Sequence, residues 1–159
     1  MNNSLITIII PVYNEEKTIL TILEKISEVK KIIKNMQVVV VDDGSNDNTK
    51  NIIVKNNQFY DLFFSFDKNV GKGGAVKKGL ELSQGKYVMF QDADLEYDPI
   101  EIVKFFEIIK KFDPDLIIGS RFNYPDYTRS HNILNKIGNQ FLTFLFNILY
   151  NTTFTDIYS

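Results

Sequence analysis

The sequence contains no cysteine, no tryptophan and a single histidine, His131, among its 159 residues. The absence of cysteine excludes disulfides, thiolate metal sites and a cysteine nucleophile. One histidine cannot build a zinc site, so His131 is interpreted as an exposed loop residue. The chain also lacks an excess of basic residues: its net charge of −2 argues against a nucleic-acid binder, which usually carries a basic face.

Long apolar segments are missing too. No stretch reaches the roughly 20 apolar residues that a membrane-spanning helix needs, and the nearest, residues 141–150, is short and interrupted by Thr143 and Asn147. The N-terminus carries neither the basic segment nor the cleavage signal of a secretory peptide. These features predict a cytoplasmic protein whose only membrane contact would be peripheral, at the cytoplasmic face.

The residues that are present have a globular composition, with 44% hydrophobic and 13% aromatic residues. A chain of this length can bury a core of its own. No repeat, low-complexity tract or linker marks a boundary, so we expect one domain over residues 1–159. The oligomeric state cannot be inferred from these features.

Short β-branched or aromatic runs alternate with segments of helical periodicity. Strands are predicted at residues 5–10, 38–41, 62–66, 87–91 and 116–118, with helices between them and an aromatic-rich helix at residues 133–150. This alternation is typical of an α/β protein with a doubly wound, mostly parallel sheet. In the common strand order 3-2-1-4, the first and fourth strands are neighbours.

Local signals predict where helices begin and end. Asn14 is predicted to cap the first helix, with Glu15 and Glu16 in its first turn. Gly85 is predicted to end the helix of residues 75–84. The aromatic helix is predicted to pack on the sheet as core, with a place at the bilayer surface as the alternative.

Three acidic residues, Asp92, Asp94 and Glu96, directly follow the strand predicted at residues 87–91. Open α/β sheets bind ligands beyond the carboxyl ends of their strands, and the predicted strand order brings residues 11–15 to the same edge. Carboxylates are hard oxygen donors, which suit Mg²⁺ or Mn²⁺ bound together with phosphates. An Asp-x-Asp pair alone is weak evidence for such a metal site, and a solvated acidic loop is the alternative interpretation.

The glycine-rich segment of residues 69–74 precedes a predicted helix. It is not a Walker A loop, because no serine or threonine follows Lys72. It is not a dinucleotide fingerprint either, because it follows the third strand and not the first. Its glycines suit a closely packed turn, and its place at a helix N-terminus makes it a candidate neighbour of a phosphate.

Five segments occur in the order typical of family 2 glycosyltransferases: PVYNEE at 11–16, VDDGS at 41–45, NVGKGGA at 69–75, QDAD at 91–94 and GSR at 119–121. Within that family the chain most resembles polyprenyl-phosphate sugar transferases, such as dolichyl-phosphate mannose or glucose synthases. The resemblance covers nearly the whole chain and implies the A-type glycosyltransferase fold. Because the family usually continues past residues 155–159, it also implies a complete nucleotide-binding part and an incomplete, truncated acceptor part.

The resemblance implies a binding site for a UDP- or GDP-sugar. Pro11, Tyr13 and Glu15 would border the base and ribose. Val41 and Asp43 would close the far side of the base pocket, with Asp43 accepting a hydrogen bond from the base. Both uracil and guanine offer N–H groups to such acceptors, so both donors remain open.

The resemblance also implies roles for the acidic segment. Asp92 and Ala93 would contact the nucleotide, while Mg²⁺ or Mn²⁺ would be held by Asp92, Asp94 and Glu96. The family often has glutamine at the position of Glu96. Asp94 would be catalytic through the metal, and Arg121 would be the second catalytic residue, facing a phosphate of the donor or of the acceptor.

The implied reaction is a metal-dependent, inverting transfer of a hexose to a polyprenyl phosphate, for cell-envelope glycans or protein glycosylation. A lipid phosphate is already an anionic nucleophile, so it needs positioning cations and no general base. Arg121 and Arg129 are the candidates for its phosphate. Two alternatives are a module that binds a nucleotide sugar without turnover and a polysaccharide-elongating transferase. The second would need an acceptor-side carboxylate base, and the sequence offers no convincing one before Asp156.

Overall fold

The computed structural model describes residues 6–119 and 133–154. The chain divides into two compact units, Met1–Asp113 and Pro114–Ser159. The first unit contains the sheet and the helices packed against it. Among the described residues, the second contains one long helix. The single domain predicted over residues 1–159 remains a prediction.

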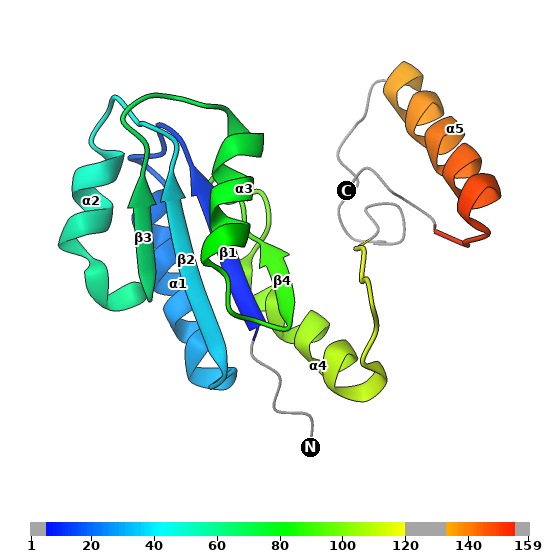
Figure 1. Cartoon of the computed structure of the whole chain (residues 1–159), viewed down its shortest axis with the longest axis horizontal. Coiled ribbons are helices and arrows are strands. Elements are labelled where there is room, and N and C mark those ends of the chain that lie inside the picture. The colour runs from blue at the N-terminus through cyan, green and yellow to red at the C-terminus, as the bar shows by residue number, and fades with distance from the viewer. Residues whose placement is uncertain (1–5, 120–132, 155–159) are drawn as a thin grey trace. The chain divides into compact units, whose positions relative to one another are not determined.

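A parallel four-stranded sheet forms the centre of the first unit (Figure 1). Its strands are β1 (Ile6–Val12), β2 (Met36–Asp42), β3 (Leu62–Ser65) and β4 (Tyr87–Phe90). The order β3-β2-β1-β4 confirms the predicted arrangement, in which β1 and β4 are neighbours. In the register, Ile9 pairs with Val39 on one side and with Phe90 on the other.

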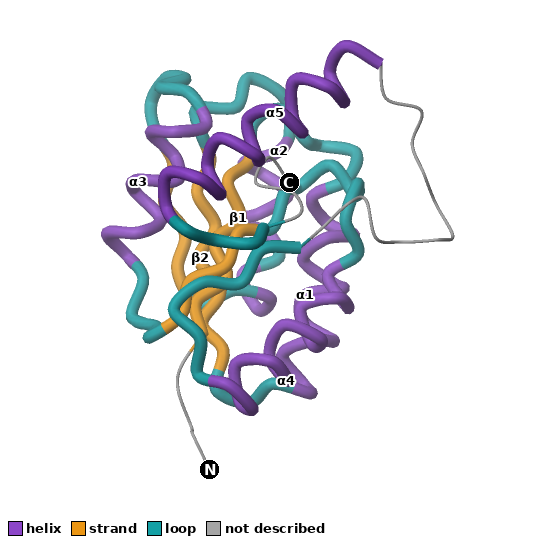
Figure 2. The backbone as a smooth tube through the Cα atoms, turned by 90° about the vertical axis from the view of Figure 1, so that its right-hand side faces the viewer, coloured by secondary structure: helices purple, strands orange, loops and turns teal. Residues whose placement is uncertain are grey.

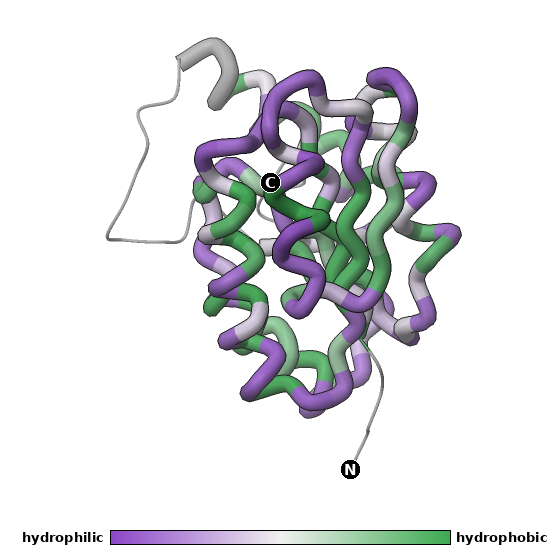
Figure 3. The backbone as a smooth tube through the Cα atoms, turned by 90° about the vertical axis from the view of Figure 1, so that its left-hand side faces the viewer, coloured by the Kyte–Doolittle hydropathy of each residue, from purple (hydrophilic) through white to green (hydrophobic). Residues whose placement is uncertain are grey.

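β1 and β2 are buried along their whole length. Isoleucine and valine fill both faces of these strands, as expected where helices cover a parallel sheet on both sides. Figure 3 shows the strands as hydrophobic segments between more hydrophilic loops. β4 differs from the buried strand that the sequence predicts, since Phe90 is 50% exposed. The reason is that β4 lies at an edge of the sheet that the structure describes.

Helices cover the two faces of the sheet. They are α1 (Ile19–Ile32), α2 (Thr49–Lys55), α3 (Lys72–Leu82) and α4 (Ile102–Phe112), with 3-10 turns η1 (Asn57–Phe59) and η2 (Pro99–Glu101). Figure 2 shows α3 on one face and α1 with α4 on the other, and α2 packs beside α1. α1 buries residues at helical spacing, among them Ile22, Ile26 and Val29.

Pro11 lies inside β1, which continues to Val12, beyond the end at residue 10 that the sequence predicted. The Ile9 carbonyl accepts from the Gln91 N–H on the β4 side, and the Val12 carbonyl accepts from the Asp43 N–H on the β2 side. Backbone groups alternate along a strand, so Pro11 faces the same side as Ile9, beyond the end of β4 at Phe90. Pro11 therefore has no N–H to continue the ladder beyond Gln91, and the pairing of β1 with β4 ends here while its pairing with β2 continues to Val12.

The predicted caps of two helices are wrong. α1 begins at Ile19 with Thr18 as its N-cap, and Glu15 and Glu16 precede its first turn. Asn14 has a left-handed φ of 55° and bonds to another loop.

α3 ends at Leu82 and not at Gly85. Gly85 instead lies against β1, where an added Cβ would stand 2.6 Å from the Thr7 nitrogen. Its N–H donates to Thr7 Oγ1 at 2.9 Å. This glycine is therefore required for a close approach of two backbones.

The second unit contains α5 (Ile133–Tyr150), at the boundaries that the sequence predicts. The Asn147 side chain closes its C-terminal turn, accepting from the Thr152 hydroxyl at 2.8 Å and from the Phe154 N–H at 2.9 Å. The strand predicted at residues 116–118 is wrong, because residues 116–119 have no regular structure. No helix within the described ranges has the length and apolar character that crossing a bilayer requires. Packing of α5 on the sheet remains a prediction.

Candidate functional site

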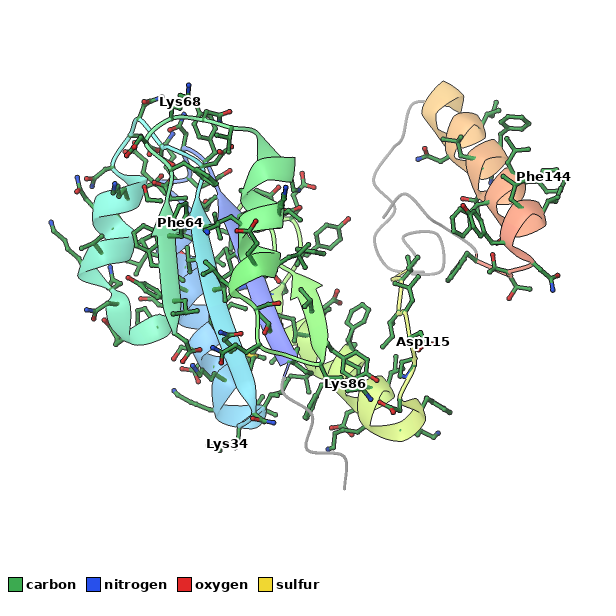
Figure 4. The ribbon with its side chains drawn as sticks, in the orientation of Figure 1. Lys34, Phe64, Lys68, Lys86, Asp115 and Phe144 are labelled. Atoms are coloured by element: carbon green, nitrogen blue, oxygen red, sulfur yellow. The ribbon has the colours of Figure 1, made fainter. Side chains whose placement is uncertain are left out.

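A cleft of about 260 Å³ opens where the strands β1, β2 and β4 end. It is lined by Pro11, Val12, Tyr13, Glu15, Asp43, Asn69, Lys72, Ala75, Asp92, Ala93 and Asp94. In Figure 4, Lys68 marks this end of the sheet, while Lys34 and Lys86 lie at the opposite end. Four segments far apart in the sequence therefore meet at one edge, and the predicted strand order requires this of the three at the ends of β1, β2 and β4.

Most residues predicted for the donor site lie together in this cleft: Pro11, Tyr13, Glu15, Asp43, Asp92, Ala93 and Asp94. Val41 does not line it. Its side chain is fully buried in a core cluster with Ile9, Val39 and Ala75. Arg121 and Arg129 lie outside the described residues, so their phosphate contacts remain predictions.

Four further residues line the cleft: Val12, Asn69, Lys72 and Ala75. Asn69 and Lys72 come from the glycine-rich segment and Ala75 directly follows it. The place of this segment at the N-terminus of α3 was the available signal. Gly71 precedes α3 with a φ of 89°, a conformation that favours glycine. The turn therefore directs the first residue of α3, Lys72, to the cleft.

Asp43 connects the end of β2 to the glycine-rich turn. Its side chain is 3% exposed, and its two oxygens accept from the N–H groups of Val70 at 2.8 Å and Gly71 at 2.9 Å. Each carboxylate oxygen has a second lone pair, so Asp43 can hold the turn and still accept from a ligand. It does not cap α2, whose N-cap is Asn48.

Gln91 organises the acidic segment after β4. The side chain is 4% exposed, and its Nε2 donates to the carbonyls of Asp92 and Tyr97, each at 3.1 Å. Leu95 has a left-handed φ of 64°, which reverses the chain inside this loop. These contacts hold the segment in a closed turn that presents Asp92 and Asp94 to the cleft.

A cation and an anion-binding helix end lie beside these carboxylates. Lys72 Nζ is 2.7 Å from Asp92 Oδ1, and both side chains are accessible to solvent, so the pair adds little stability. Lys72 also begins α3, whose N-terminus carries a partial positive charge. This part of the cleft therefore suits a phosphate.

The carboxylates fit a divalent cation that a ligand helps to hold. Within the described ranges, no three acidic or histidine side chains form a ready metal cluster. Glu96 is exposed and does not line the cleft, although its N–H donates to Asp94 Oδ1 at 2.9 Å. Mg²⁺ is usually bound by one or two carboxylates together with substrate phosphates, and Asp92 with Asp94 meets that requirement.

Known proteins are similar to this chain in sequence and in fold. The chain is 32% identical to a UDP-N-acetylglucosamine–dolichyl-phosphate N-acetylglucosaminyltransferase of Methanococcus voltae, over 96% of this chain and 67% of that protein. TarS 1–349 of S. aureus, solved with UDP-GlcNAc, is similar with a TM-score of 0.64 and 25% identity. That match covers 76% of this chain and 38% of TarS 1–349.

The mannosyltransferase PcManGT of Pyrobaculum calidifontis, solved with GDP-Man and Mn²⁺, matches with a TM-score of 0.55 and 27% identity. The match covers 63% of this chain and 30% of that one. The PcManGT structure thus holds Mn²⁺ beside a nucleotide sugar. The two likenesses confirm the predicted A-type glycosyltransferase fold.

The chain spans 31 to 67% of the length of the curated relatives that it matches. The sequence model of Glycosyl transferase family 2 matches residues 7–157, and the chain belongs to that family.

Proposed function

We propose that this chain binds a nucleotide-diphosphate sugar in the cleft and transfers the sugar, with inversion, to a polyprenyl phosphate in a metal-dependent reaction. The observation that carries the proposal is the convergence of Asp43, Lys72, Asp92 and Asp94 on one cleft. One end offers acceptors for a base, and the other offers charges for a diphosphate.

The base would bind between the ends of β1 and β2. Tyr13, 40% exposed, offers a ring beside the cleft, and Glu15 and Asp43 offer carboxylate oxygens to N–H groups. Both uracil and guanine carry such groups. The relatives named above include one with a UDP-sugar and one with a GDP-sugar, so the proposal covers both donors.

The diphosphate would bind between Lys72 and the two aspartates. Asp92 and Asp94 would hold Mg²⁺ or Mn²⁺, which when bound neutralises charge on the departing nucleoside diphosphate. Lys72 and the N-terminus of α3 would add positive charge on the other side. Asp43 supports this arrangement, because it fixes the turn that precedes Lys72.

The acceptor would supply an oxygen of its phosphate as the nucleophile. This oxygen would form a bond to the anomeric carbon while the bond from that carbon to the diphosphate oxygen breaks, which inverts the configuration. A phosphate is ionised at neutral pH and needs only positioning, for which Arg121 and Arg129 are the candidates. The dolichyl-phosphate acceptor of the Methanococcus relative supports this class. Such an acceptor would be reached at a membrane surface.

Calorimetric titration with UDP-GlcNAc and GDP-mannose, with and without Mn²⁺, tests the donor site. We expect Mn²⁺-dependent binding of at least one donor, and a loss of about tenfold or more in Asp94→Asn, because a metal ligand is removed. Glu107→Gln, which removes an exposed carboxylate of α4, should bind like the wild type.

Turnover is tested separately, by following nucleoside diphosphate release with a polyprenyl phosphate in detergent. Binding without release would favour the nucleotide-sugar-binding module, and release with a growing polysaccharide acceptor would favour an elongating transferase. A chain that binds neither donor would contradict the proposed function.

A further inference from the structure

The loop that carries Tyr13 and Glu15 is held by side chains of the loop that follows β2. We call residues 13–16 the cleft loop and residues 44–49, which end with the first residue of α2, the clamp loop. The cleft loop lies between the end of β1 and the start of α1, so its N–H groups have no partner in a strand or helix. Three of them donate to the clamp loop: Asn14 to Ser45 Oγ at 2.9 Å, Glu15 to Thr49 Oγ1 at 2.8 Å and Glu16 to Asp47 Oδ2 at 3.2 Å.

The clamp loop also donates back. Asn46 N–H donates to Asn14 Oδ1 at 2.8 Å, and Asn48 N–H donates to Glu16 Oε2 at 3.0 Å. Asn46 Nδ2 also donates to the Tyr13 hydroxyl oxygen at 3.4 Å. Six hydrogen bonds thus join two loops more than 30 residues apart in the sequence. They hold Asn14 in a left-handed conformation that is uncommon outside glycine.

Thr49 is the centre of this contact and is fully buried. Its hydroxyl accepts from Glu15 N–H and hydrogen-bonds to the Asp47 carboxylate, while its own N–H donates to Asp47 Oδ1 at 2.9 Å. Burial alone would raise the pKa of Asp47, but hydrogen bonds from Thr49 and from Glu16 N–H outweigh it and lower that pKa. Asp47 therefore stays ionised and keeps accepting these bonds at neutral pH.

Thr49 does not line the cleft, whereas both residues beside Asn14 do. Thr18 Oγ1 adds a bond to Glu15 Oε2 at 2.6 Å, so the backbone and the carboxylate of Glu15 are both fixed. We propose that Thr49, with Asp47, is a positioning residue that pre-forms the base side of the donor site by fixing Tyr13 and Glu15. This inference rests on the proposed function and adds residues that would not touch the donor.

Thr49 should affect binding of the base and ribose of the donor but not binding of its diphosphate. Removing the Thr49 hydroxyl should weaken contacts to the base and ribose, which the cleft loop would make. It should leave binding of the diphosphate unchanged, because Lys72, Asp92 and Asp94 are held by Asp43 and Gln91 instead. The probes are therefore UDP and GDP against inorganic pyrophosphate, each with Mn²⁺.

The variant is Thr49→Val, which keeps the shape of the side chain and removes the hydroxyl. We expect calorimetry to give about a tenfold weaker affinity for UDP or GDP, the size that losing a supporting hydrogen bond has at other sites. Affinity for Mn²⁺-pyrophosphate should not change. Thr49→Ser, which restores the hydroxyl, should restore nucleotide affinity.

Thr7→Val is the matched control. Thr7 is also fully buried, and its hydroxyl also accepts a backbone N–H, that of Gly85 at 2.9 Å, but it lies at the other end of β1. We expect the control to lose thermal stability and to keep wild-type affinity for UDP or GDP. A merely structural role for Thr49 predicts that both valine variants behave alike.

Wild-type affinity for UDP or GDP in Thr49→Val would overturn the inference while leaving the proposed function intact. A wild-type chain that binds neither nucleotide would overturn both. If Thr49→Val does not fold, Asp47→Ala, which changes a partly exposed side chain, takes its place with the same expected results. Equal weakening of nucleotide and pyrophosphate binding would also contradict the separation that we propose.

Discussion

Two adjacent aspartates at the end of β2 have different surroundings. Asp43 lines the cleft and holds the glycine-rich turn. Asp42 is fully buried and accepts from the Ser45 N–H, the Ser45 hydroxyl and the Ser65 hydroxyl. The hydrogen-bonding capacity of a buried carboxylate with three donors is satisfied without any ligand. We therefore assign Asp42 a role in the stability of the fold and not in ligand binding.

Asp42→Asn should lower the free energy of unfolding by about 2 kcal/mol, because an amide has one acceptor oxygen where the carboxylate has two and its NH₂ would face donors. Urea denaturation measures this change. Ser65→Ala, which removes one donor, should cost about 1 kcal/mol. An Asp42→Asn variant as stable as the wild type would contradict this assignment.

At the scale of elements, α3 approaches β1 closely because Gly79 lies at their contact. A Cβ added to Gly79 would stand 2.4 Å from Ile9 Cγ2, and Gly79 is buried. Gly73, in the first turn of the same helix, would meet nothing within 4 Å. Substituting alanine at each of the two glycines therefore distinguishes the effect of packing from the effect of helix propensity.

Gly79→Ala should destabilise the protein by about 1–2 kcal/mol, because overpacking outweighs the better helix propensity of alanine. Gly73→Ala should be neutral or should gain up to about 1 kcal/mol, since only the propensity changes. Denaturant midpoints of the two variants give the comparison. Equal effects would show that α3 shifts away from β1 to accommodate the methyl group.

At the scale of the whole first unit, ion pairs connect elements far apart in the sequence. Lys25 of α1 pairs with Asp98, the N-cap of η2, at 2.7 Å, and Asp98 also accepts from the Ile100 N–H at 3.1 Å. The hydrogen bond from Lys25 is the largest cause that lowers the pKa of Asp98 below 3.8, with a further contribution from Ile100. Asp98 thus joins α1 to the segment that leads into α4.

Because folding lowers the pKa of Asp98, its contribution to stability is present above pH 3.8 and is lost as the pH falls through the folded-state pKa. Asp98→Ala should cost about 1 kcal/mol at pH 7, mostly as a lost cap. The difference from the wild type should shrink below pH 3.8. Lys25→Met should cost less, since this ion pair is exposed. Urea unfolding at pH 7 and pH 3 checks both; a difference that is independent of pH would contradict the assignment.

Most of the fold could be predicted from local patterns. β-branched runs such as residues 38–41 indicate buried strands, and the periodic apolar residues of α1 indicate an amphipathic helix. Caps could not be predicted in the same way, because Asn14 bonds to a loop more than 30 residues away instead of to its own helix. Val41 was assigned to the base pocket from a motif, but it lies inside β2, which is buried on both faces, and its side chain packs in the core.

The order of the motifs was enough to predict the family and to place Asp92 and Asp94 at the edge of the sheet. The alternation of strand and helix patterns indicated the doubly wound sheet, for which the strand order 3-2-1-4 is common. The residues that support the site could be identified only from the folded chain. Lys72 beside Asp92, Asp43 beneath the glycine-rich turn and Thr49 beneath Glu15 are contacts between segments separated by 20 to 34 residues. Such pairs depend on where loops meet after the sheet has formed, which no local pattern encodes.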